Sequence, residues 1–313
     1  MEVRPAATWP AYLDLHRKGE LARRAETARE MLGDCRVCPR NCRVNRLEEE
    51  IGFCGVGRRA LVGSAGPHMG EERPLVGSGG SGTVFFAGCN LGCVFCQNAE
   101  LSHGRGGGQV TARELADTML ALQQRGCHNI NFVTPSHVMP QILEALVPAI
   151  DGGLRLPLVY NCGGYESVET LRLLDGVVDI YMPDAKYADT EVADRLSCAP
   201  DYPERMREAL AEMHRQVGDL QMDERGIATR GLLVRHLVLP EGQAGTAEVM
   251  EFIASLSRDT YVNVMAQYRP CYRAGEFPPL DRHPTREEYR EAVEQTLAAG
   301  LHRLDERPLR GLW

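Results

Sequence analysis

The chain has 313 residues, of which 43% are hydrophobic and 25% are charged, the proportions of a soluble globular protein. Its net charge of −8 argues against general nucleic-acid binding, which requires basic patches. The sequence has no apolar run near the roughly 20 residues that a membrane-spanning helix needs, so we expect no membrane association.

The eleven cysteines are the most informative part of the composition. Seven of them fall in two clusters, and the first ten residues lack the basic-then-apolar order of a secretory signal. Clustered cysteines in a chain of this size are typical of metal ligands in a reducing compartment. We therefore expect a cytoplasmic, oxygen-sensitive enzyme.

Residues 9–33 are expected to form a surface helix, because their apolar residues are sparse. The first cysteine cluster follows, with Cys35, Cys38, Cys42 and Cys54. Its opening C-x2-C pair and its full set of four thiols favour a closed zinc site. A likeness to short ferredoxin spacings favours a 4Fe-4S cluster instead, and a disulfide pair is the third alternative. We predict metal binding here and leave the metal open.

The second cysteine cluster lies in residues 83–98, T-V-F-F-A-G-C-N-L-G-C-V-F-C-Q-N, directly after an apolar run. Cys89, Cys93 and Cys96 have C-x3-C-x2-C spacing. Thiolates select iron–sulfur clusters or zinc, and three ligands leave one metal position open to a substrate or cofactor. The alternative is a zinc knuckle or three unrelated thiols, although zinc motifs usually contain paired C-x2-C units.

Residues 56–82, between the two clusters, are rich in glycine, serine and proline and are expected to form a loop or short hairpin rather than a helix. We therefore divide the chain into two parts. Residues 1–76 are expected to form a helical, four-cysteine metal-binding extension, and residues 77–313 the catalytic domain.

From residue 83 onward, apolar runs alternate with amphipathic segments. The expected strands are residues 83–87, 129–134, 156–161, 177–182, 231–239 and 261–266. The expected helices are residues 112–125, 136–151, 167–175, 190–196, 203–217, 246–257 and 286–299. Thr111 and Thr285 each precede a glutamate by three residues, as in a capping box. This alternation predicts an α/β fold with a parallel sheet.

Parallel barrels carry their chemistry on the loops that follow the carboxyl ends of the strands. The polar residues expected there are Thr134, Ser136, His137, Asn161, Cys162, Tyr165, Asp184, Lys186, Arg235, His236, Gln267, Tyr268, Arg269 and Cys271. Because Arg235 and His236 alternate on one strand, at most one of them faces inward, and we favour Arg235. A capping role for His137 is as well supported as a site role. Asp184 and Lys186 could form a plain ion pair, but their position favours the site.

The cysteine triad, with Phe95 directly before its last member, resembles the signature of the radical S-adenosylmethionine (SAM) enzymes. The resemblance implies a partial, TIM-like (β/α)6 barrel in which Cys89, Cys93 and Cys96 hold a 4Fe-4S cluster whose fourth iron chelates SAM. It further implies an electron donor such as flavodoxin or ferredoxin. Reductive cleavage of SAM then gives a 5′-deoxyadenosyl radical that abstracts hydrogen from a substrate.

Several segments are also similar to the glycyl-radical-activating group, in the branch of pyruvate formate-lyase activating enzyme homologues. C-Q-N, ending at Asn98, parallels the C-H-N of that group, and N-C-G-G, beginning at Asn161, parallels D-T-N-G. P-D-A-K, with Asp184 and Lys186, parallels L-D-L-K, and V-R-H-L-V-L-P parallels R-x-V-x-x-P. By this resemblance, these residues lie at positions that contact SAM or a cation.

The chain departs from that group at two positions of the site. The G-G-E motif that holds the SAM amino group is absent, and T-P-S-H, from Thr134 to His137, takes its place. Backbone carbonyl groups there, together with Ser136, could accept hydrogen bonds from an ammonium group. Tyr268 stands where the activating enzymes have a histidine.

Three functions are consistent with these patterns. The first is abstraction of hydrogen from a glycine in a partner glycyl radical enzyme. The second is a small-molecule epimerase or mutase in which Cys271 returns a hydrogen atom. The third is a non-catalytic iron–sulfur or zinc scaffold that does not bind SAM. We predict a radical SAM enzyme, with Cys271 and Arg235 as its candidate catalytic residues.

Overall fold

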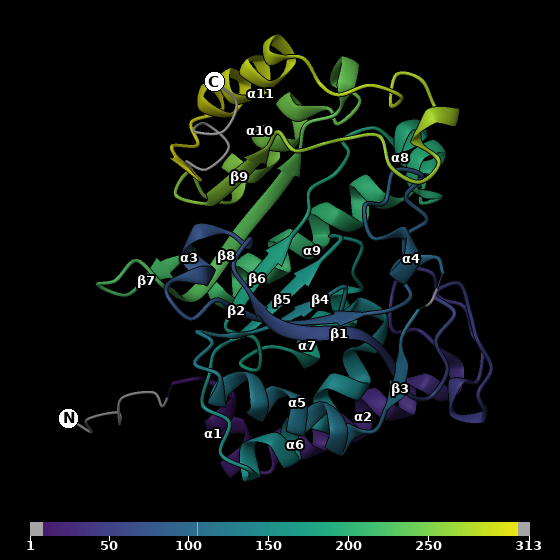
Figure 1. The fold of residues 1–313 in the computed structure, drawn as a ribbon, viewed down its shortest axis with the longest axis vertical. Coiled ribbons are helices and arrows are strands. Elements are labelled where there is room, and N and C mark those ends of the chain that lie inside the picture. Colours follow the sequence, from purple (N-terminus) through teal and green to yellow (C-terminus); the bar gives the residue numbers. More distant parts are fainter. Residues whose placement is uncertain (1–8, 105, 306–313) are drawn as a thin grey trace.

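The computed structural model describes residues 9–104 and 106–305, so residues 1–8 and 306–313 of the two predicted segments lie outside the described residues. The described chain forms a ten-stranded sheet in the order β10-β9-β8-β6-β5-β4-β2-β1-β3, with β7 paired to β8 (Figure 1). The strands are β1 (Ala60–His68), β2 (Ser81–Phe86), β3 (Gly108–Val110), β4 (Ile130–Val133), β5 (Leu158–Cys162), β6 (Ile180–Pro183), β7 (Gln221–Met222), β8 (Ala228–Leu237), β9 (Tyr261–Met265) and β10 (Arg303–Leu304). The α-helices are α1 (Tyr12–Arg17), α2 (Glu20–Glu30), α3 (Arg73–Val76), α4 (Ala99–Ser102), α5 (Ala112–Gln124), α6 (Met139–Asp151), α7 (Val168–Leu173), α8 (Thr190–Ser197), α9 (Tyr202–Val217), α10 (Thr246–Leu256) and α11 (Arg286–Ala298).

The parallel part of the sheet consists of β2, β4, β5, β6, β8 and β9, with the short β10 beside β9. These six strands coincide, within a few residues, with the six strands predicted from the sequence. The predicted α/β fold with a partial barrel is therefore confirmed. The described sheet is open, because it ends at β10 on one edge and at β3 on the other.

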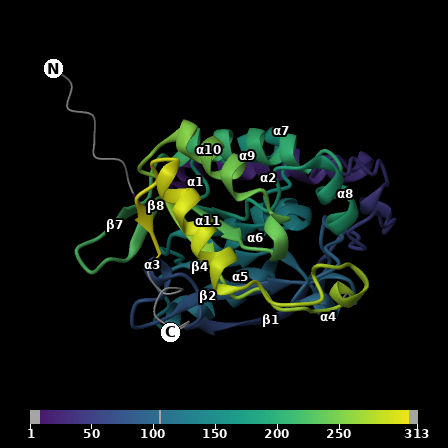
Figure 2. The same ribbon diagram turned by 90° about the horizontal axis from the view of Figure 1, so that it is seen from above.

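Helices cover the outer face of the parallel strands, as right-handed crossover connections require. Helix α7 packs on α9, and α9 packs on α10; Figure 2 shows the three side by side on one side of the strands. Both predicted capping boxes are confirmed. The hydroxyl groups of Thr111 and Thr285 accept the backbone N–H groups of Glu114 and Glu288 at 3.2 and 3.1 Å.

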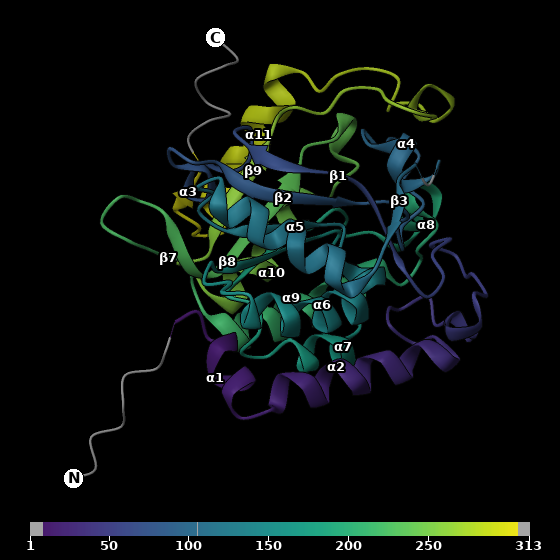
Figure 3. The same cartoon turned by 60° about the horizontal axis from the view of Figure 1, so that its bottom comes forward.

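The N-terminal helix differs from its prediction in two ways. The single helix expected over residues 9–33 is two helices, because Gly19 has a left-handed φ of 69° between α1 and α2. Helix α2 then lies along α6 (Figure 3) and buries Leu21, Ala25 and Ala28. The apolar stripe was underestimated because small alanine side chains form most of it.

Strand β1 lies within residues 56–82, where the sequence predicted a loop or short hairpin. It runs antiparallel to β2, with His68 opposite Ser81 at one end and Val62 opposite Phe86 at the other. The connection from β1 to β2 contains Glu71, Glu72 and the short helix α3. It therefore brings two carboxyl groups to the amino-terminal end of the barrel.

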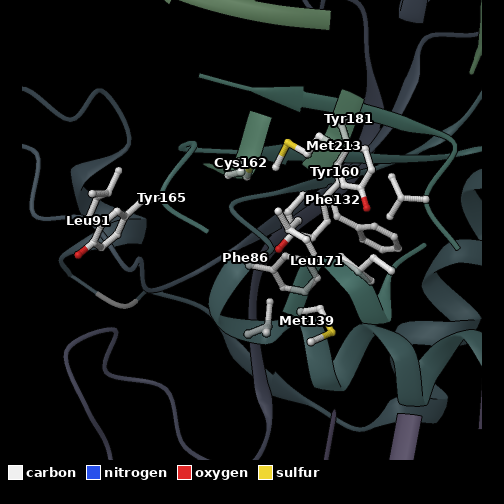
Figure 4. Packing of buried hydrophobic residues seen from close by; sticks show 14 of the residues in the cluster. Phe86, Leu91, Phe132, Met139, Tyr160, Cys162, Tyr165, Leu171, Tyr181 and Met213 are labelled. Carbon is white, nitrogen blue, oxygen red and sulfur yellow. The ribbon is translucent and has the colours of Figure 1, made fainter. Parts of the chain in front are cut away.

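Two apolar clusters hold this architecture together. The larger lies between the strands and the helices, where the rings of Phe86 and Phe132 stack with centroids 6.2 Å apart (Figure 4). The smaller joins Leu75 of α3 to Val159 and Leu233 on the opposite face of the sheet. Side chains two residues apart on a strand share a face. Asn161 and Arg235 therefore face the same interior as this plug, one step closer to the carboxyl ends.

Candidate functional site

The loop that carries Cys89, Cys93 and Cys96 connects β2 to α4 at the carboxyl end of the parallel strands. Helices α4 and α8 lie close together at this end (Figures 1 and 2). The loop begins at Gly88, which has a φ of +81°, and a Cβ atom there would lie 2.6 Å from the carbonyl oxygen of Cys54. Only glycine fits this position, so the turn holds the three-cysteine loop against the first cysteine cluster.

The environment of the three sulfur atoms suits thiolate ligands. Each sulfur accepts or shares a hydrogen bond, and the pairs are Leu91 N with Cys89 Sγ (3.4 Å), Ser197 Oγ with Cys93 Sγ (3.0 Å) and Ser102 Oγ with Cys96 Sγ (3.0 Å). Such hydrogen bonds stabilise the negative sulfur and adjust cluster potential. The loop therefore supplies both the thiols and their supporting donors.

Burial separates the protonation behaviour of the three thiols. It raises the pKa of Cys89 to about 12, with the neighbouring Cys93 adding to the effect. Burial also raises the pKa of Cys93, although the charge of Lys186 opposes it. At Cys96, burial is outweighed by hydrogen bonds from His103 and Ser102, which bring the pKa below its ordinary value. Metal binding would release the thiol protons and offset the cost of burying thiolates.

The spacing of the thiols fits a cluster better than a single ion. Within residues 9–104 and 106–305, no three Cys, His, Asp or Glu side chains are placed to hold one metal ion. Three thiols that each bind a different iron atom need not converge on one point. The three-cysteine loop therefore fits a 4Fe-4S cluster.

The segment after β9 covers this loop. The backbone N–H of Arg273 donates to the carbonyl oxygen of Val94 at 2.9 Å, and the Tyr272 ring stacks on His103 with centroids 4.7 Å apart. Cys271, the proposed hydrogen donor, directly precedes these two contacts. The fold thus brings Cys271 to the mouth of the barrel, beside the three-cysteine loop.

A charged network lies beside the same loop. Asp184 accepts hydrogen bonds from Lys186 Nζ at 2.6 Å and from Arg235 Nε at 2.8 Å. Arg235 also donates to Asn161 Oδ1 at 2.6 Å. Burial alone would raise the pKa of Asp184, but the charges of Arg235 and Lys186 hold it below its usual range. Four of the predicted site residues are therefore in contact across β5, β6 and β8.

Two residues of the interior were not predicted from the sequence. Glu71 accepts a hydrogen bond from Asn161 Nδ2 at 3.1 Å, and Glu72 accepts one from Asn263 Nδ2 at 3.1 Å. Glu72 lies 3.9 Å from Arg235. The sequence signal was only an adjacent glutamate pair in a segment expected to be a loop. These contacts extend the charged network toward the amino end of the barrel.

Some acceptor atoms of this interior are unpaired. Among the described residues, Glu72 Oε2, Asn131 Oδ1 and Asn263 Oδ1 are buried without a hydrogen-bond partner. Buried acceptors without partners are rare in folded proteins. The interior is therefore suited to a ligand that carries hydrogen-bond donors.

Several predicted residues lie away from this interior. The Ser136 hydroxyl donates to Glu166, and the Tyr268 hydroxyl donates to the carbonyl oxygen of Leu280 at 2.6 Å. His236 is on the outer face of β8, where its Nε2 atom lies 3.0 Å from Thr246 Oγ1 of α10.

The remaining predicted residues form the edges of the site. Thr134 has a left-handed φ of 61°, and its backbone N–H donates to the carbonyl oxygen of Asn161. The ring of Phe95 packs against Tyr268 with centroids 5.8 Å apart. Asn98 directly precedes α4, and its carbonyl oxygen accepts a hydrogen bond from the Ser102 hydroxyl at 3.0 Å.

The four N-terminal cysteines come together at a second place. They line one small pocket, which Arg46 and His137 also line. His137 Nε2 lies 2.9 Å from the carbonyl oxygen of Ala87, two residues before Cys89. Burial lowers the pKa of His137 to about 4. His137, the first residue group after β4, thus belongs to the boundary between the two cysteine clusters.

Comparison with known proteins agrees with this geometry. A model of the radical SAM superfamily matches residues 83–220, the part of the chain that holds the three-cysteine loop and Asp184. The chain belongs to the radical SAM superfamily, and membership implies a 4Fe-4S cluster, SAM and a source of electrons.

The chain is 33% identical over 279 residues to the uncharacterized protein MJ0674 of Methanocaldococcus jannaschii, covering 87% of this chain and 76% of that protein. A radical SAM methyltransferase from Sphaerobacter thermophilus is similar in structure, with a TM-score of 0.45 and 18% identity. That match covers 70% of this chain and 64% of the methyltransferase chain, a little under two thirds. None of the helices in the described parts of the chain has the length and apolar character needed to cross a bilayer.

Proposed function

We propose that the protein cleaves SAM reductively at the three-cysteine loop and abstracts a hydrogen atom from a substrate at the mouth of the barrel. The observation that carries this proposal is the contact of the charged network with the cysteine loop: Lys186 influences the thiols of both Cys89 and Cys93 while bonded to Asp184. Cysteine ligands and an ordered polar site therefore occupy the same end of the barrel.

In this proposal, Cys89, Cys93 and Cys96 hold the cluster, and bound SAM supplies a 5′-deoxyadenosyl radical when it is reduced. Asn161, Asp184 and Lys186 orient SAM, and backbone carbonyl groups near Thr134 receive its ammonium group. Phe95, Asn98 and Tyr268 shape the wall of the site rather than bonding to the reacting atoms, and Ser136 acts through Glu166. Arg235 keeps Asp184 ionised and in place, because its guanidinium group binds Asp184 and Asn161 together.

For the substrate, we propose a glycine in a partner protein, as in glycyl-radical-activating enzymes. The open edge of the sheet supports this assignment, since a peptide loop needs a wide entrance. Flavodoxin or ferredoxin would supply the electron. We also propose that residues 1–76 form a metal-binding extension to a catalytic domain of residues 77–313. All eleven cysteines are free thiols, which supports a reducing, cytoplasmic setting.

The position of Cys271 favours a second candidate, a small-molecule epimerase or mutase. Its charge would raise the pKa of the nearby Tyr268 hydroxyl, after the larger effect of burial, so the thiol lies close to that ring. A thiol at the mouth could return a hydrogen atom to a carbon radical on a small substrate.

The first test is formation of 5′-deoxyadenosine by anaerobically reconstituted protein given SAM and a strong reductant. We expect product from the native protein and none above background from Cys93→Ala, since the loss of one ligand disrupts the cluster. Cys127→Ala, which changes a buried thiol distant in sequence from both clusters, should retain full activity. If a fully iron-loaded native protein made no 5′-deoxyadenosine with or without candidate substrates, the proposal would fail and a scaffold role would replace it.

A second test separates the two substrate classes. Cys271→Ala should leave 5′-deoxyadenosine formation unchanged in either case, because Cys271 does not bind the cluster in the proposal. If the protein is an epimerase that relies on this thiol, product release with the hydrogen returned should fall by at least about 100-fold, the scale typical of losing a proton- or hydrogen-transfer group. Unchanged turnover in Cys271→Ala would remove the epimerase candidate.

A further inference from the structure

The four N-terminal cysteines surround a pocket rather than a point. Cys35, Cys38, Cys42 and Cys54 all line it, yet within the described residues no three of these thiols are placed to bind one ion. A structural zinc ion requires four ligands at about 2.0–2.3 Å from a single centre. In a four-iron cluster, each thiolate binds a different iron, so the sulfur atoms stand apart around an inorganic core.

Arg46 provides a second, independent observation. Its side chain is only 1% exposed and lines the pocket. Nη1 donates to the carbonyl oxygen of His137 at 2.8 Å and lies 3.9 Å from Cys35 Sγ. Nη2 is buried without a hydrogen-bond partner among the described residues. A buried guanidinium group needs nearby negative charge, and the sulfide ions of a cluster offer acceptors that a lone zinc ion does not.

Backbone groups around the pocket are arranged to donate to sulfur. The N–H of Phe53 donates to Cys42 Sγ at 3.5 Å. Those of Arg40 and Val56 donate to Cys38 and Cys54, and lower the pKa of each thiol against the larger, opposing effect of burial. Amide donors to ligand sulfur are one means by which proteins set the potential of iron–sulfur clusters.

Glycine at position 52 is needed for the close approach of the chain to this site. A Cβ atom there would lie 2.7 Å from Cys42 Sγ and 2.8 Å from Cys42 Cβ. Asn41 and Arg43, on either side of Cys42, both have left-handed φ values, 48° and 60°. Non-glycine residues adopt such values at an energetic cost, so the loop is shaped to point Cys42 into the pocket.

We propose that Cys35, Cys38, Cys42 and Cys54 bind a second 4Fe-4S cluster, and not zinc. All four iron atoms then have protein ligands, so this cluster has no open position for SAM. It adjoins the three-cysteine loop directly, because Arg40 Nε donates to the carbonyl oxygen of Asn90 at 2.8 Å and Cys54 packs against Gly88.

The test uses the full chain with Cys89, Cys93 and Cys96 all changed to alanine, which leaves the N-terminal site intact. The protein is purified without oxygen from cells supplied with both iron and zinc, and its iron, acid-labile sulfide and zinc are measured. We expect about eight iron atoms per native chain and about four iron and four sulfide in the triple variant, with a Mössbauer signature of a four-iron cluster. About one zinc per chain without iron, or neither metal, would overturn the proposal.

A complementary variant guards against misfolding of the first. Cys35→Ser combined with Cys42→Ser should reduce the iron of the native chain from about eight to about four atoms, whereas Cys127→Ser should leave it at about eight. Circular dichroism checks that each variant is folded. No reduction of iron in the double variant would also overturn the proposal. Neither measurement requires turnover, so a failure of SAM cleavage would leave both results interpretable.

Discussion

Glu166 is a buried carboxyl group whose protonation is set by its surroundings. It accepts hydrogen bonds from the hydroxyl groups of Ser136 and Tyr160, the latter at 3.0 Å. Burial raises its pKa from 4.5 to about 7, although these hydrogen bonds and one with Cys162 oppose the rise. The folded-state pKa lies above the unfolded one, so the folded protein binds the proton more tightly, and stability falls as pH rises from about 4.5 to about 7.

Glu166→Gln should remove this pH dependence. A glutamine side chain stays neutral, and the two hydroxyl groups can reverse their hydrogen bonds to it. Between pH 4.5 and pH 8, the native protein should lose on the order of 3 kcal/mol more unfolding free energy than the variant. Anaerobic denaturant unfolding of equally iron-loaded samples at these two pH values measures the difference. Parallel losses in both proteins would show that Glu166 is already ionised in the fold.

The residues of the site differ in how far the sequence could predict them. Alternation along one strand separated Arg235 from His236, because successive side chains on a strand face opposite sides. The structure places Arg235 on Asp184 and His236 on Thr246. Glu72 could not be predicted in this way, because it contacts Asn263 across 191 residues of chain. A contact at that separation depends on the path of the fold and not on local pattern.

At the scale of elements, strongly patterned segments were predictable and weakly patterned ones were not. The six parallel strands are buried apolar runs bounded by turn residues, which is a strong signal. Strand β1 contains Gly63, Gly66 and Pro67 and is largely exposed along its middle. Its place is determined by pairing with β2, so its own residues gave little indication of a strand.

The capping box at the start of α11 offers a test at this scale. Thr285→Ala removes the hydroxyl that accepts the N–H of Glu288, and should lower the unfolding free energy by about 1 kcal/mol. Thr285→Ser keeps an oxygen at the same position and should cost little. Thermal unfolding of the two variants beside the native protein measures the difference. Equal stability of the alanine and serine variants would mean that Arg282, which also binds Glu288, holds this helix end by itself.

At the scale of the whole molecule, the two cysteine clusters lie side by side although the sequence separates them by strand β1. Each cluster was recognisable from its spacing. Their adjacency was not, because it follows from the reversal of the chain at β1 and from the return of β2 past Cys54. The same reversal places Glu71 and Glu72 inside the barrel, so one antiparallel strand determines both the wall between the clusters and part of the interior.

The contacts of Arg40 have a consequence for how the protein acquires iron. This side chain lies between Cys38 and Cys42 and donates to the carbonyl oxygens of Asn90, Ser197 and Cys198, while the Ser197 hydroxyl supports Cys93. Ordering either cysteine loop therefore prearranges the other. Binding at one site must then favour binding at the other by the same factor in both directions. When iron is scarce, a population of these molecules should divide into full and empty chains, with few that are half loaded.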